Sequence, residues 1–194
     1  RLPSNDFRRV ERPLLVTATD VDGRGRVVFG QGFDDRTPIS QAVAASSCVP
    51  LLFRPYRIGD RYLVDGELVR TLSLDLAVEA GADVVVISNV YRPHVAKDGE
   101  TSLAHGGAPA VARQTLNIIL SEKERRGIDL LHRLYPHVTL INVSADLGLF
   151  SFIDRAGVKG LLTRGYREAL RVLLAAKQRG VFDGTARAKV VGSA

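Results

Sequence analysis

Methionine is absent from the sequence, and cysteine occurs only once, at position 48. A single cysteine excludes an internal disulfide framework. A chain of 194 residues with no methionine, which starts at Arg1, is expected to be processed or partial, unless modified methionines are missing from the written sequence. Cys48 follows a run of small residues, and this setting favours a buried structural thiol over a nucleophile.

Long hydrophobic runs are also absent. No segment approaches the length of a membrane-spanning helix. The start of the chain does not combine a basic segment with an apolar one, so no signal peptide is visible. From these absences we expect a cytoplasmic or peripheral membrane protein. The composition, 45% hydrophobic and 25% charged, is ordinary for a globular chain with one good core. We therefore expect a single domain over residues 1–182 and a tail over 183–194.

The net charge of +6 leaves three interpretations open. A basic surface attracts anionic phospholipid headgroups, attracts nucleic acid, or is simply dispersed over a hydrated exterior. The sequence has no nucleic-acid-binding motif, so we expect no nucleic-acid partner. Asp34 and Asp35 are adjacent but have no cluster of ligands near them, which favours solvated loop acids over a metal site. No phosphate-binding glycine loop follows a strand, and we expect neither a metal nor a cofactor.

The apolar segments predict an α/β fold. Strands are expected at 14–20 and 27–29, as a hairpin near a sheet edge, and a second hairpin joins 56–58 to 61–64. Thr37 is expected to cap a short helix of small residues that starts at Pro38. Further on, helices are predicted at 72–80, 110–134 and 158–177, the second bent or divided at Gly127, and strands at 84–87 and 138–143. The fully apolar strand 84–87 is typical of a parallel sheet covered on both faces.

Asp65 is the first candidate for chemistry. It follows Tyr62, Leu63 and Val64 at the end of an apolar strand. A carboxylate in such a place costs desolvation free energy unless a partner compensates for it. The alternative is that Asp65 only forms a turn with Gly66.

The residues around Asp65 carry a resemblance. The run Ala-Val-Ala-Ala-Ser-Ser-Cys-Val-Pro-Leu-Leu-Phe-Arg-Pro, followed by Tyr-Leu-Val-Asp-Gly, resembles the second half of a patatin-like phospholipase domain, and the likeness extends over about residues 13–89. This family has serine acyl hydrolases with a Ser–Asp dyad and no metal, whose aspartate lies in Asp-Gly-Gly or Asp-Gly-Ala. Asp65 and Gly66 match that motif. Glu67 stands where the family has a small residue, and Thr71 and Ser73 stand near the places of an Asn and a Pro.

The resemblance implies a three-layer α/β/α patatin-like domain with a mainly parallel sheet, incomplete at its N-terminus. It implies that Asp65 is the general base of a lipid acyl hydrolase, supported by Gly66. The nucleophile motif G-x-S-x-G does not occur in the sequence. The serine is therefore expected in a preceding segment of the same polypeptide, which would be a partner of this chain together with a lipid or ester substrate. The alternative is a non-catalytic patatin-like scaffold that binds lipid or protein.

Two loops offer weaker candidates. His94 and His105 lie in a Gly- and Pro-rich stretch over 92–109, where exposed histidines are favoured over a Ser–His arrangement. Phe150 and Phe152 flank Ser151 in an apolar loop, which either contacts a membrane or anchors the loop to the core.

Overall fold

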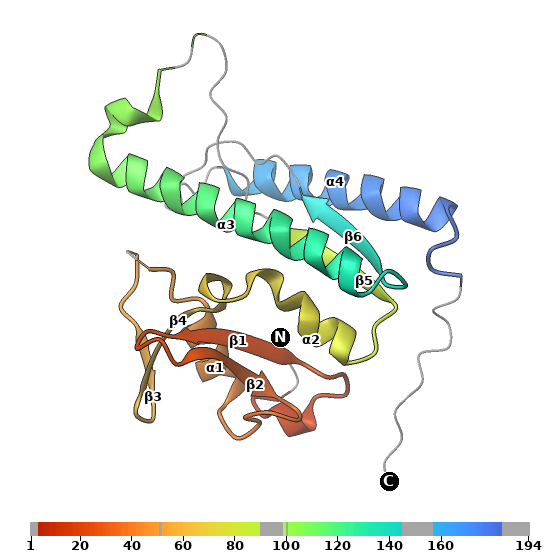
Figure 1. Cartoon of the computed structure of the whole chain (residues 1–194), viewed down its shortest axis with the longest axis horizontal. Coiled ribbons are helices and arrows are strands. Elements are labelled where there is room, and N and C mark those ends of the chain that lie inside the picture. The colour runs from red at the N-terminus through yellow and green to blue at the C-terminus, as the bar shows by residue number, and fades with distance from the viewer. Residues whose placement is uncertain (1–3, 51, 90–98, 100, 145–156, 184–194) are drawn as a thin grey trace. The chain divides into compact units, whose positions relative to one another are not determined.

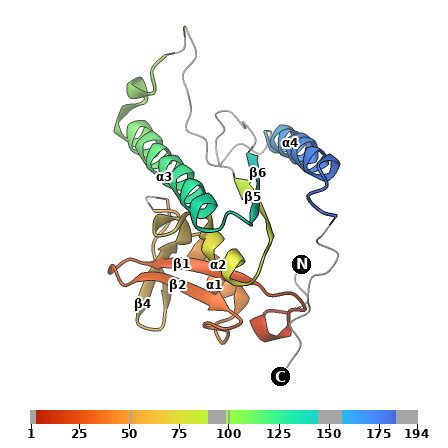
Figure 2. The ribbon, with the colours of Figure 1, turned by 45° about the vertical axis from the view of Figure 1, so that its right-hand side comes forward.

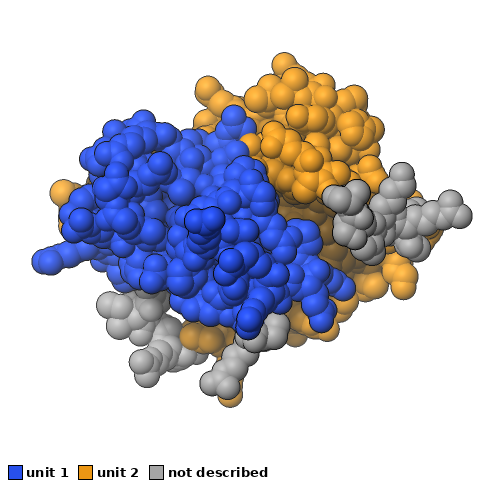
Figure 3. Space-filling model, turned by 90° about the horizontal axis from the view of Figure 1, so that it is seen from below, with its two compact units in different colours: residues 1–73 blue, residues 74–194 orange. Residues whose placement is uncertain are grey.

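The computed structural model describes residues 4–50, 52–89, 99, 101–144 and 157–183 (Figure 1). The chain divides into two compact units, residues 1–73 and residues 74–194, which Figure 3 draws in different colours. Each unit contains both helices and strands, so the fold is α/β. The assignment of 1–182 to one domain stays a prediction, and the predicted tail lies almost entirely outside the described residues.

Unit 1 is built on a four-stranded sheet in the order β2-β1-β4-β3. Its strands are β1 (Leu15–Asp20), β2 (Gly25–Gly30), β3 (Tyr56–Ile58) and β4 (Arg61–Asp65). All three pairings are antiparallel, with Ala18 opposite both Val27 and Asp65. Both hairpins are confirmed, and β2 lies at an edge as predicted. Turns this short reverse the chain, so they produce antiparallel pairs.

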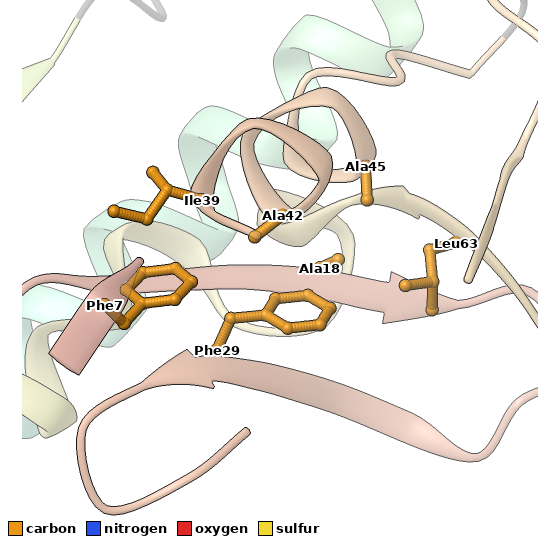
Figure 4. Close-up of a cluster of buried hydrophobic side chains, with 7 residues drawn as sticks. All are labelled: Phe7, Ala18, Phe29, Ile39, Ala42, Ala45 and Leu63. Atoms are coloured by element: carbon orange, nitrogen blue, oxygen red, sulfur yellow. The ribbon is translucent and has the colours of Figure 1, made fainter. Parts of the chain in front are cut away.

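One face of this sheet packs against helix α1 (Ile39–Ser46) and the 3-10 helix η1 (Phe7–Arg9). Ala42 and Ala45 are completely buried on α1, and their small side chains let the helix lie close to the strands. Phe7 and Phe29 fill the space beside them (Figure 4). Complete burial of one such side chain contributes about 1.5–3 kcal/mol. The full cluster is Phe7, Ala18, Phe29, Ile39, Ala42, Ala45 and Leu63.

The start of α1 corrects one prediction. Thr37 makes no cap; its hydroxyl donates to Asp34 Oδ2 at 2.7 Å, and Pro38 occupies the N-cap position without a side-chain bond. Asn5 serves this end of the helix instead. Its carbonyl oxygen accepts from Ile39 N–H at 3.1 Å, and its Oδ1 accepts from Ser40 N–H at 2.8 Å. Since Asn5 is 35 residues away, no local pattern indicated it.

Unit 2 contains a parallel strand pair, β5 (Val84–Asn89) and β6 (Thr139–Ser144), with Val86 opposite Ile141. Helices α3 (Gly107–Leu134) and α4 (Val158–Gln178) flank this pair, one on each side (Figure 2). A short helix, α2 (Leu74–Glu79), leads into β5, and the 3-10 helix η4 (Leu103–Gly106) leads into α3. None of the helices in the described ranges is long and apolar enough to cross a bilayer.

Several boundaries in unit 2 differ from the predictions. Helix α3 is not divided at Gly127, because one helix covers Gly107–Leu134. The stretch 92–109 is not a plain loop to its end, because η4 and the start of α3 lie in it. Val86 is 50% exposed, so β5 is not covered on both faces. A mainly parallel sheet is not confirmed: among the described strands, four are antiparallel and two are parallel.

Candidate functional site

Asp65 is the last residue of β4, as predicted. Its backbone N–H donates to the carbonyl oxygen of Cys48 at 3.0 Å, just after α1, and its Cα lies opposite Ala18 of β1. Side chains alternate along a strand, so Asp65 lies on the same sheet face as Leu63, the face that α1 covers. The backbone of Asp65 is thereby fixed from a helix end and from a neighbouring strand.

The Asp65 carboxylate is half-buried. Its Oδ1 accepts a hydrogen bond of 3.0 Å from Glu67 N–H. Burial raises the pKa of this carboxyl above its ordinary value, and the hydrogen bond from Glu67 acts in the opposite direction. A carboxylate with a raised pKa is a stronger base, so this environment suits a residue that must accept a proton.

Gly66 follows Asp65 directly. At Gly66, the backbone of the next turn lies against β1. It begins the 3-10 helix η2 (Gly66–Leu68) and is buried. A Cβ atom built there would lie 2.5 Å from both the carbonyl oxygen and the Oγ1 of Thr17. Only glycine fits this approach without a shift of β1. Glycine at position 66 is thus a structural requirement here, whatever the role of Asp65.

Glu67 occupies the position that differs from the family motif. Its carboxylate oxygens accept from Leu72 N–H at 3.0 and 3.1 Å. Leu72 and Ser73 both have positive φ, 61° and 44°, which is unusual for residues with a side chain. They belong to the 3-10 helix η3 (Thr71–Ser73), so the predicted helix at 72–80 begins only at Leu74. Glu67 therefore holds the end of an unusual turn.

Ser73 ties the same turn back to the sheet. Its Oγ lies 3.2 Å from Thr17 Oγ1 on β1. Sequence reasoning noted Glu67 and Ser73 only as departures from a motif and missed Thr17. Thr17 and Ser73 are 56 residues apart, so only the fold brings them together. The side chain of Thr71 lies outside the described part of the structure.

Another carboxylate of unit 1, that of Asp20, is buried and has a structural role. Its Oδ1 accepts from Asp22 N–H at 2.9 Å in the β1–β2 turn. The guanidinium of Arg24 lies 3.9 Å from Asp20 Oδ2, 3.9 Å from Asp22 and 3.8 Å from Asp60. An arginine thus supplies positive charge to these three acids. Asp20 stabilises the turn.

The remaining candidates have simpler explanations. Cys48 is buried and donates through Sγ to the Ala44 carbonyl oxygen at 3.2 Å, which confirms a structural thiol. Asp34 accepts from Thr37 and from Arg36 N–H; burial acts to raise its pKa, but these bonds lower it below the ordinary value. His105 is exposed in η4, with Nδ1 3.2 Å from the Ser102 carbonyl oxygen. His94, Phe150 and Phe152 lie outside the described residues.

Residues 2–78 match the family model described as Patatin-like phospholipase. This segment, which includes Asp65 and Gly66, is similar to the patatin-like phospholipase family, and the resemblance found in the sequence is confirmed there. The match covers less than half of the chain and ends close to the boundary of unit 1. It supports a lipid hydrolase family for the matched segment.

Proposed function

We propose that this protein is a serine acyl hydrolase acting on carboxylic esters of lipids, with Asp65 as the general base of a Ser–Asp dyad. The observation that carries the proposal is the position of Asp65. It is a half-buried carboxylate at a strand end, with a raised pKa, inside the segment that matches the Patatin-like phospholipase family. Gly66 supports it by letting the following turn lie against β1.

The serine is assigned to a segment that precedes this chain in the same polypeptide, because the sequence contains no G-x-S-x-G. The strand and helix of that nucleophile motif would add the parallel, three-layer part of the domain. In the proposed reaction, Asp65 takes the proton of the serine hydroxyl while the serine oxygen attacks the ester carbonyl carbon. The proton then passes to the leaving alkoxide, and an acyl-enzyme remains. Water hydrolyses the acyl-enzyme, with Asp65 again as the base.

The proposal is tested on the serine-bearing polypeptide. This polypeptide should hydrolyse a p-nitrophenyl ester and become covalently labelled by a fluorophosphonate, since both reactions need an activated serine. EDTA should not change the rate, because the dyad uses no metal. Vesicle or protein binding with neither hydrolysis nor labelling would favour the non-catalytic scaffold instead. Activity that EDTA removes and a divalent ion restores would contradict the dyad.

A further inference from the structure

Helix α4 presents a continuous ridge of large apolar side chains to the exterior. Five residues, each four positions after the last, are between 44% and 69% exposed. Side chains four apart on a helix are neighbours, so these five form one ridge along the helix. The helix itself was predicted from the sequence, and the structure leaves these five side chains exposed. We call it the α4 ridge: Val158, Leu162, Tyr166, Leu170 and Leu174.

The α4 ridge is not the surface that holds the helix to its unit. Helix α4 packs against β6, and its completely buried residue, Ala176, is not one of the five ridge residues. Leu161 and Leu173 are partly buried, while their neighbours Leu162 and Leu174 are exposed. The helix thus has two apolar surfaces, of which β6 uses one. Scattered exposed apolar residues are normal on a protein surface, but an ordered row of five indicates an interaction.

Positive charge follows one side of the ridge. Lys159, Arg167 and Arg171 each come one position after a ridge residue, so they form a parallel row beside it. All three are exposed. The helix contains five Lys or Arg residues and a single acidic one, Glu168, which pairs with Arg171 at 2.7 Å. The uncovered apolar surface is therefore bordered by cations.

We propose that the α4 ridge docks this protein onto an anionic lipid bilayer. An apolar row with Lys and Arg beside it is the pattern of helices that lie in the membrane interface. The apolar side chains enter the headgroup boundary, while the long basic ones keep their charges at the phosphates. A second copy of the chain fits less well, because pairing two such helices brings like charges together. The inference is independent of the proposed hydrolysis, since it is measured as binding without turnover.

The experiment measures co-sedimentation of the protein with vesicles of phosphatidylglycerol and phosphatidylcholine. The double variant Leu162→Ser with Tyr166→Ser should bind at least about tenfold more weakly, because two large side chains no longer leave water. Its matched control is Ile118→Ser with Ile119→Ser on α3, two residues that are 49% and 57% exposed. The control should bind like the wild type.

The charge is tested separately. Arg167→Gln should weaken binding about fivefold, as expected for one basic residue near an anionic surface, and Arg133→Gln on α3 should not. Binding should also fall with added salt and with vesicles of phosphatidylcholine alone. Far-UV circular dichroism checks that each variant is folded; if the double variant is not, Arg167→Gln decides the question. Equal binding by ridge and control variants would overturn the proposal. So would self-association without vesicles that the ridge variants abolish.

Discussion

Two features of its surroundings shift the pKa of Asp65 in opposite directions. Burial raises the pKa of its carboxyl above 3.8, and the Glu67 N–H opposes the shift. The pKa of Asp65 is higher in the folded state than in the unfolded state. The stabilisation that this group contributes is therefore fully present below pH 3.8 and is lost as the pH rises through the raised pKa. The fold therefore keeps a carboxylate at neutral pH at some cost in stability. The proposed role of Asp65 as a base would account for such an arrangement.

The raised pKa makes a prediction for catalysis. A general base works only when it is deprotonated, so kcat/KM of the serine-bearing polypeptide should fall with decreasing pH through the pKa of Asp65. The midpoint of this acidic limb should lie above 3.8, the ordinary value for an aspartate. A pH–rate profile with a soluble ester measures it. An acidic limb at or below the ordinary value would show that a different group acts as the base.

Glu67 is predicted to stabilise the turn after Asp65. Glu67→Ala removes the acceptor for Leu72 N–H and should lower the free energy of unfolding by about 1 kcal/mol. Glu67→Gln retains a carbonyl oxygen that can accept the same bond, and should lose much less. Urea denaturation of both variants separates the two results. Equal losses would mean that the charge of Glu67, and not its hydrogen bond, is what matters.

At the scale of elements, the junction between β4 and η2 depends on close contact with β1. Gly66→Ala places a methyl group 2.5 Å from the Thr17 carbonyl oxygen, so β1 or the turn must move. We expect a loss of about 1–3 kcal/mol in stability, as for other overpacked sites. Reduced ester hydrolysis should accompany this loss because Asp65 is the adjacent residue.

The matched control is Gly160→Ala on α4, where an added Cβ meets nothing within 4 Å. Alanine favours a helix over glycine, so this variant should gain up to about 1 kcal/mol. Thermal unfolding of both variants tests the pair. If Gly66→Ala were as stable as the wild type, the close approach of the turn to β1 would be wrong.

The elements of this fold were largely predictable because their signals are local. Turn residues at 22–25 and 59–60 gave both hairpins, and apolar periodicity gave α3, α4 and the strands of unit 2. The predictions that were wrong depend on contacts between residues far apart in the sequence. Asn5, not Thr37, supplies the hydrogen bonds at the start of α1, and Glu67 and Ser73 hold a turn where a helix was predicted. A helical pattern carries no information about such partners.

At the scale of the whole molecule, the resemblance to a family was confirmed over residues 2–78, whereas the mainly parallel sheet that it implied was not. The apolar strand 84–87 did predict a parallel pair, which β5 and β6 form. It did not predict that the strands of unit 1 make an antiparallel sheet, although two short hairpins already favoured one. Asp65 could be singled out as a candidate because an acid that ends an apolar strand is unusual. The exposure of the α4 ridge was not predictable, because a row of apolar residues has the same sequence pattern whether or not another surface covers it.

The proposed role of Asp65 as the base of the reaction can be tested with its amide variant. In the serine-bearing polypeptide, kcat for a p-nitrophenyl ester is compared between Asp65→Asn and Asp60→Asn, an exposed acid in the same hairpin as Asp65. The amide keeps the shape of the side chain but cannot take the serine proton. Asp65→Asn should lose about 10³–10⁴-fold in kcat and remain folded, while Asp60→Asn stays near the wild type. Near-wild-type hydrolysis by Asp65→Asn would show that Asp65 is not the base.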